Sequence, residues 1–159
     1  MMNSKKSNIF KILIPIILIL LVVIIFGVVH FISGNKLLRG VSWGQSVNSV
    51  VKQEQKKDSS ADISVSDNKI FISPVTIYDR GGAKLWYYFD DDKLNKILVR
   101  YENCYKDEDF SSISNSVANE FGEPVTEKQN YMTWSLKDTF ISLEYDSSHY
   151  SIDLTLKKQ

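Results

Sequence analysis

The chain has 159 residues, and its 19 basic and 19 acidic side chains give a formal net charge of zero; it contains one cysteine. A single cysteine cannot form an intrachain disulfide or a thiolate zinc cluster, so the sequence excludes both. Three lysines precede residue 12, which leaves the remainder mildly acidic and gives no reason to expect nucleic acid or anionic lipid as the main partner.

Residues 12–32 are predicted to form a transmembrane signal anchor, with residues 1–11 in the cytoplasm. The apolar run over residues 12–29 contains no charge, and as a helix it would span roughly 27 Å, close to the hydrocarbon thickness of a bilayer. The basic residues before this run outnumber those just after it, which predicts a cytoplasmic N-terminus. We therefore expect a single-pass protein of the cell membrane that binds the membrane through residues 12–32 and whose C-terminal part is extracytoplasmic.

A cleaved signal peptide is the alternative for this segment. The apolar run is longer than the roughly 7–15 apolar residues of such peptides, and residues 31–34 approximate a small-residue cleavage site poorly. No cysteine follows the run, so a lipid-modified N-terminus is excluded. An uncleaved anchor is favoured, with a short flexible linker over residues 33–42.

The extracytoplasmic domain is predicted over residues 43–159, and it begins with a helix. Ser46 is a suitable N-cap, because its hydroxyl can accept a hydrogen bond from an unpaired N–H of the first turn. Three valines then recur at helical spacing and predict the buried side: Val47, Val50 and Val51. Residues 52–60 are polar throughout, which predicts a solvated helix end and loop.

Alternating apolar residues from Ile63 onward predict antiparallel strands. Residues 70–77 form the first, and Pro74 within it predicts an edge strand or a bulge. The Gly81–Gly82 pair predicts the hairpin turn that follows. Two further strands are expected, over residues 85–89 and 97–101.

A second helix is predicted from Asp107, because three consecutive acidic residues suit the positive end of a helix dipole. Apolar residues then recur at helical spacing, and Gly122 followed by Pro124 ends the helix. Three strands are expected after it, over residues 131–136, 139–145 and 150–156.

The order is therefore α+β, a helix–βββ–helix–βββ antiparallel sheet, which predicts an internal duplication with repeats over residues 43–105 and 106–159. One helix on three strands buries little surface, whereas two such units can share a sheet. The matched positions are Leu85, Tyr87 and Phe89 with Ile141, Leu143 and Tyr145, then Ile97, Val99 and Tyr101 with Ile152, Leu154 and Leu156. Amphipathic strands also match by chance, which is the alternative.

Several short motifs resemble the helix-plus-meander domains of bacterial envelope proteins. They are Trp43-Gly44-Gln45-Ser46 before a valine-rich helix, a Tyr/Phe-rich meander, and Phe121-Gly122-Glu123-Pro124 before a strand with a tryptophan. The resemblance covers residues 43–156 and is to the β-barrel-assembly lipoproteins of the SmpA/OmlA type and to the tandem architecture of the β-lactamase inhibitor protein. It implies a binding module that engages another protein. The chain departs from the lipoproteins in having an apolar anchor and no lipid-attachment cysteine.

No residue pattern indicates catalysis, a cofactor or a metal. The acidic clusters at 90–92 and 107–109 lack the spacing of a calcium loop, and a turn and a helix N-terminus explain them. His149 lies in a predicted turn beside two serines, where adjacent residues cannot easily form a catalytic relay. Cys104 is expected to be structural. We therefore predict that the protein is not an enzyme, with an undetected hydrolase as the remote alternative.

The aromatic residues of the meander are the main functional signal. Trp86 and Tyr88 alternate with the apolar side of their strand, and Lys96 and Arg100 lie at the same parity on the next strand. One interpretation is a sheet packed on both sides or shielded by residues 52–69. The other is an exposed contact face, because Tyr and Trp are enriched where proteins bind one another or bind glycans.

We predict a membrane-anchored, extracytoplasmic module that is non-catalytic and binds an envelope protein or otherwise associates with the envelope. The alternative is a sensory or ligand-binding domain that captures a small molecule or a cell-wall glycan on the same aromatic face.

Overall fold

The computed structural model describes residues 37–59 and 61–159. The predicted anchor at 12–32, its flank at 1–11 and the first part of the linker lie outside the described residues. Within the described part of the chain, no helix is long and apolar enough to cross a membrane.

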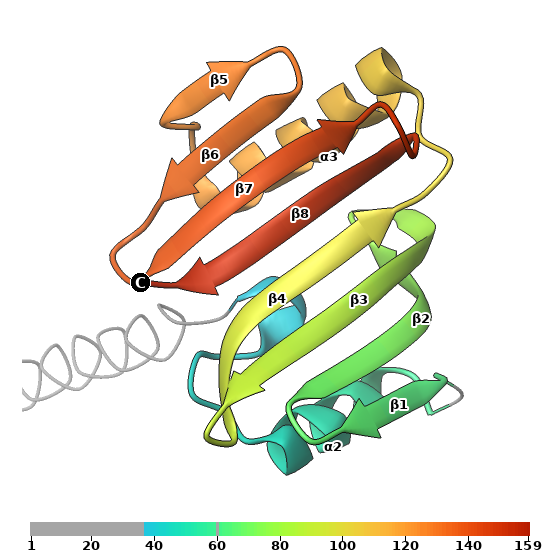
Figure 1. The fold of residues 1–159 in the computed structure, drawn as a ribbon, viewed down its shortest axis with the longest axis vertical. Coiled ribbons are helices and arrows are strands. Elements are labelled where there is room, and N and C mark those ends of the chain that lie inside the picture. Colours follow the sequence, from blue (N-terminus) through green and yellow to red (C-terminus); the bar gives the residue numbers. More distant parts are fainter. Residues whose placement is uncertain (1–36, 60) are drawn as a thin grey trace, which may run out of the picture. The chain divides into compact units, whose positions relative to one another are not determined.

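The described residues form an α+β fold in which one antiparallel sheet of eight strands carries two α-helices (Figure 1). The strand order is β1-β2-β3-β4-β8-β7-β6-β5. In chain order the elements are the short 3-10 helix η1 (Leu38–Gly40), α2 (Val47–Lys57), β1 (Ile63–Ser66), β2 (Lys69–Ile77), β3 (Arg80–Asp90), β4 (Lys93–Tyr101), α3 (Lys106–Phe121), β5 (Thr126–Lys128), β6 (Tyr131–Ser135), β7 (Thr139–Asp146) and β8 (Ser151–Lys158).

The predicted fold class is confirmed, but each helix is followed by four strands rather than three. The two additional strands, β1 and β5, lie at opposite edges of the sheet and have four and three residues. They are short and largely exposed, so they lack the run of alternating buried residues that reveals a strand in a sequence. The two meanders join where β4 pairs with β8, and Val99 lies opposite Leu154 there.

Both helices lie on the same face of the sheet (Figure 1). The apolar side chains on that face are buried, as for Leu85 and Ile97 in the first meander and Leu143 and Leu154 in the second. Within residues 37–59 and 61–159, no helix covers the opposite face (Figure 1). The interpretation in which the sheet is packed on both sides is therefore wrong for this part of the chain.

Helix α2 starts where the sequence predicts, because the Ser46 hydroxyl accepts a hydrogen bond from the backbone N–H of Ser49. Its end differs from the prediction. The helix continues to Lys57, and Glu54, expected in a solvated segment, is only 1% exposed.

Helix α3 begins one residue before its predicted start at Asp107 and ends as predicted, with three acidic residues in its first turn and Gly122 at its C-cap with a φ of 90°. The buried side of this helix carries Phe110, Ile113 and Val117. The indole N–H of Trp134 donates to the carbonyl oxygen of Gly122 at 2.7 Å, which ties the end of the helix to β6.

The hairpin between β2 and β3 differs in detail from the prediction. Tyr78 and Asp79 form the turn with φ values of 53° and 58°, so Gly81 and Gly82 belong to β3. Pro74 lies at a break in register between Ile72 and Val75, which confirms the bulge. The strand β2 is not an edge strand, although β1 pairs with it only as far as Ile72.

The folded unit begins before residue 43. Leu38 is 3% exposed and Val41 is fully buried, so the second part of the predicted linker at 33–42 belongs to the core. Trp43 then reaches the other half of the sheet, where its indole N–H donates to the hydroxyl oxygen of Thr139 at 2.8 Å.

Candidate functional site

The sheet face turned away from the helices, called here the open face, carries all four predicted site residues. Trp86, Tyr88, Lys96 and Arg100 are partly exposed, while the residues that alternate with them are buried. The four side chains therefore lie on one face of the sheet, as their alternation along the strands predicts. What the structure adds is the register, which determines the cross-strand neighbours of each residue.

One row of side chains crosses the open face through all eight strands and is called the central row. Its members, each opposite the next, are Ser64, Phe71, Trp86, Leu98, Thr155, Ser142, Thr133 and Thr126. The first meander contributes Ser64 and three apolar residues, Phe71, Trp86 and Leu98. The second meander contributes only hydroxyl-bearing residues. The open face is therefore chemically asymmetric although its two halves share one topology.

Phe71 and Trp86 form the aromatic part of the central row. Their ring centroids are 5.1 Å apart with the planes tilted by 33°, a separation within the favourable range for aromatic pairs. A hollow of about 400 Å³ lies beside them, lined also by Lys69 and Lys84. This arrangement presents aromatic surface next to positive charge.

A second row, called the lysine row, runs beside the central row across β2, β3, β4 and β8. It consists of Lys69, Tyr88, Lys96 and Lys157, each directly opposite the next. The Lys96 ammonium lies 4.8 Å from the centroid of the Tyr88 ring, within the range of a cation–π interaction. The sequence prediction missed Lys69 and Lys157, because only the strand pairing brings them beside Tyr88 and Lys96.

Arg100 lies on the other side of the central row and is already paired. Its Nε and one terminal nitrogen donate to the two carboxylate oxygens of Asp153 at 2.7 and 2.6 Å, and this hydrogen bonding raises the pKa of Arg100. Lys84 in the same region is 2.6 Å from a carboxylate oxygen of Glu102. Of the four predicted residues, Arg100 is therefore the one whose charge is neutralised within the chain.

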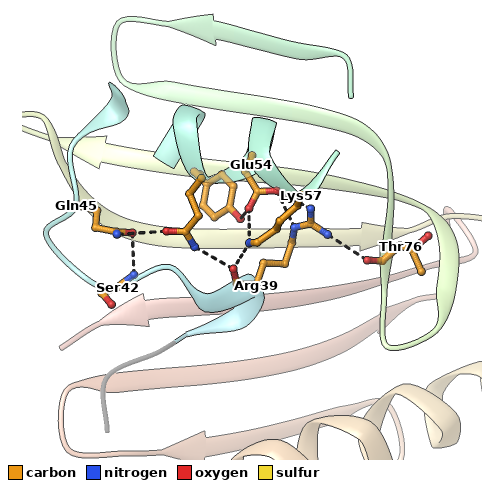
Figure 2. A network of polar contacts seen from close by, with 8 residues as sticks. Arg39, Ser42, Gln45, Glu54, Lys57 and Thr76 are labelled. Atoms are coloured by element: carbon orange, nitrogen blue, oxygen red, sulfur yellow. Dashed lines mark hydrogen bonds and ion pairs between the residues drawn. The ribbon is translucent and has the colours of Figure 1, made fainter. Parts of the chain in front are cut away.

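A second polar cluster, around Glu54, lies on the helix-covered side of the sheet (Figure 2). Glu54 Oε2 accepts hydrogen bonds from Arg39 Nε and Nη2 at 2.9 and 2.6 Å. Its Oε1 accepts from Lys57 Nζ and from the Tyr87 hydroxyl, both at 2.9 Å. Four charged or polar donors thus converge on one buried carboxylate.

The Glu54 cluster also fixes the chain segment that enters the domain. The Arg39 carbonyl oxygen accepts hydrogen bonds from Lys57 and from the Gln53 side chain, and the Arg39 guanidinium donates to the Thr76 carbonyl oxygen at 3.3 Å. Arg39 has a φ of 60°, a backbone conformation that non-glycine residues seldom adopt. These contacts hold η1 against α2 and β2, so we interpret the cluster as structural.

Burial alone would raise the pKa of Glu54. The hydrogen bonds and charges of Arg39 and Lys57 outweigh burial and hold that pKa below its ordinary value of 4.5. Burial, together with the nearby Glu54 carboxylate, raises the pKa of the Tyr87 hydroxyl well above its ordinary value. Glu54 is therefore a carboxylate and Tyr87 a neutral donor at neutral pH.

The depressed pKa of Glu54 predicts a stability change in acid. A carboxylate with a lower pKa in the folded state stabilises the fold above its unfolded-state pKa, and that contribution is lost as the pH falls through the folded-state value. We expect the stability difference between the wild-type chain and Glu54→Gln to be largest at pH 7 and to shrink steadily below about pH 4.5. Urea unfolding midpoints at pH 7, 5 and 3 measure this, and a difference that stays constant over the three would contradict it.

Cys104 and His149 are weaker candidates for a functional site. Cys104 is buried, and burial raises the pKa of its thiol, which disfavours the nucleophilic thiolate. His149 lies in an exposed turn, 2.7 Å from a carboxylate oxygen of Asp146. Among the residues that the structure describes, no three His, Cys, Asp or Glu side chains are grouped so that they could hold a metal ion.

Comparison with known proteins gives one family match. The model of the TP0088 domain matches residues 39–159, which begin at Arg39 of the Glu54 cluster and include both rows of the open face. Neither the curated proteins nor the solved structures contain a match. The resemblance to the SmpA/OmlA lipoproteins and to the β-lactamase inhibitor protein therefore stays a prediction.

Proposed function

This chain belongs to the TP0088 domain family, and we propose that it is a membrane-anchored, extracytoplasmic module that binds an envelope protein through its open face. It acts by binding, without catalysis. The predicted anchor at residues 12–32 would keep the domain near the membrane surface, so its partner would be a protein within reach of that surface.

The observation that carries this proposal is the uncovered aromatic part of the open face. Phe71, Trp86 and Tyr88 are only partly buried, and no helix of the described chain lies over them. Leaving large aromatic side chains partly in water forgoes burial that would stabilise the fold by about 25 cal/mol per Å² of apolar surface. A partner that covers this surface recovers that free energy, which is how aromatic residues come to dominate binding sites.

The arrangement of the sheet also supports our proposal that the chain arose by internal duplication. Trp86 pairs with Leu98 and Ser142 pairs with Thr155, while Leu98 and Thr155 face one another at the junction of the two meanders. A two-fold relation through that central pair exchanges the two halves of the sheet. The aromatic face would then be a specialisation of one of two similar units.

The hollow beside Phe71 and Trp86 favours a second candidate function, capture of a small molecule or a cell-wall glycan. Sugars stack on aromatic rings, and a hollow of about 400 Å³ has room for such a ligand. In that case cell-wall fragments alone would quench the tryptophan fluorescence of the protein, and replacing Trp86 by Phe would remove most of the change.

Removal of the aromatic residues tests the protein-binding proposal. We expect Trp86→Ala combined with Tyr88→Ala to lower in-cell cross-linking of the tagged full-length chain to its partner at least about tenfold, because truncated hot-spot residues cost about 2 kcal/mol or more each. Mass spectrometry of the cross-linked products gives the measurement.

The matched control replaces two residues of the second meander on the same face, with Ser142→Ala combined with Thr133→Ala. These positions lie on the same central row, so the control should keep the cross-links. Resistance to protease establishes that each variant is folded. Equal capture by both double variants would exclude the aromatic part of the face as the binding site.

A further inference from the structure

We propose that the lysine row and the central row together bind an acidic segment of the partner protein, in which carboxylate side chains lie beside apolar ones. This inference rests on the proposed function and names the chemistry of the partner. It extends the site from Trp86, Tyr88 and Lys96 to Lys69 and Lys157.

The first observation is a concentration of uncompensated positive charge. Lys96 lies directly opposite Lys157, and Lys69 is separated from Lys96 only by Tyr88. Like charges directly opposite each other on neighbouring strands destabilise a sheet. Among the described residues none of these three lysines forms an ion pair, so the fold itself does not relieve that repulsion.

The second observation is the contrast with the rest of the open face. Arg100 is paired with Asp153 and Lys84 with Glu102, so the two cations of the first meander on the other side of the central row are neutralised by the chain. The lysine row differs, because among the described residues Lys69, Lys96 and Lys157 form no ion pair. A partner that is complementary to this face places its carboxylates over that row.

The third observation concerns spacing. The two rows are two residues apart along each strand, which corresponds to about 7 Å. An extended peptide carries side chains on one side at this same spacing. A carboxylate over Lys96 and an apolar side chain over Leu98 or Trp86 can thus come from residues two apart in one segment.

The apolar members of the central row favour a protein segment over an anionic polysaccharide. Leu98 offers aliphatic surface between Trp86 and the second meander, and a polyanionic sugar chain has no apolar side chain to cover it. Burial of that surface would also exclude water from the Lys96–Tyr88 contact and strengthen the charge interactions around it.

A photo-crosslinking residue at position 98 of the full-length, tagged chain tests the inference in cells. We expect the captured peptide, sequenced by mass spectrometry, to carry two or more acidic residues near its attachment point. Lys96→Glu combined with Lys157→Glu should reduce the yield about tenfold, because each reversal replaces attraction by repulsion.

The control reverses the same amount of charge elsewhere, with Lys52→Glu combined with Lys56→Glu on the exposed side of α2, and should leave the yield unchanged. Lys96→Gln combined with Lys157→Gln provides a second variant in case the double reversal unfolds, and we expect it to lose several-fold. Protease resistance again reports folding.

The outcomes separate this inference from the function on which it rests. Capture of a segment without acidic residues, or a yield insensitive to charge at Lys96 and Lys157, overturns the acidic partner but leaves protein binding intact. Capture of an anionic polysaccharide, or of nothing from position 98, overturns both.

Discussion

Replacing Glu54 by alanine is expected to lower the free energy of unfolding by about 3–5 kcal/mol, the range observed when one partner of a buried ion pair is removed. Glu54 is 1% exposed and accepts from three side chains. Its loss leaves the Arg39 guanidinium without a counter-charge and the hydroxyl of the fully buried Tyr87 without a partner. An unsatisfied buried hydroxyl alone costs about 1–3 kcal/mol.

Urea unfolding of the full-length chain in detergent solution, followed by tryptophan fluorescence, measures this loss. Gln55→Ala is the matched control, because Gln55 is exposed on the same helix turn and should change stability by less than about 0.5 kcal/mol. A loss below about 1 kcal/mol for Glu54→Ala would show that the cluster does not hold η1 to the domain. Tyr87→Phe should recover part of the loss in the Glu54→Ala background, because it removes the orphaned hydroxyl.

The burial of Glu54 differs from what its surrounding sequence predicts. The stretch 52–60 is polar, so it reads as solvent-exposed, yet Glu54 falls seven residues after Val47 and four after Val50 on the buried side of α2. Helical periodicity could therefore have placed it on the buried side. Its partner Arg39 could not be found in this way, because the pairing depends on how the chain enters the domain.

The open face was predictable in one respect and unpredictable in another. Strand alternation is a local property, so it placed Trp86, Tyr88, Lys96 and Arg100 on one face correctly. The strand order is not local, because β4 pairs with the last strand of the chain. That pairing brings Lys157 beside Lys96 and Asp153 beside Arg100.

The same non-local pairing explains how a mildly acidic chain can carry a row of unpaired lysines in its described part. The part of the chain after the predicted anchor has a small excess of acidic residues, which argues against an acidic partner. In the folded chain, the positive and negative side chains are distributed unevenly. Asp153 and Glu102 pair with Arg100 and Lys84, whereas the lysine row keeps its charge, so a mildly acidic protein presents a local positive surface.

Replacing Leu154 by alanine is the second large expected effect, a loss of about 2–5 kcal/mol. Leu154 is fully buried and faces Val99 where β4 and β8 join the two meanders. Each meander carries only one helix on four strands, so neither buries a large core alone. The Trp43–Thr139 hydrogen bond adds a second link between the halves.

Because the junction is shared, we expect Leu154→Ala to weaken both meanders together. Amide hydrogen exchange should show a similar loss of protection in β3 and in β7, in keeping with one cooperative unit. Thr155→Ala, one residue further along β8 on the open face, should leave exchange in both strands nearly unchanged. Loss of protection in β7 alone would mean that the halves unfold separately, in which case the first meander, with Trp86, Tyr88 and Lys96, is stable without its counterpart.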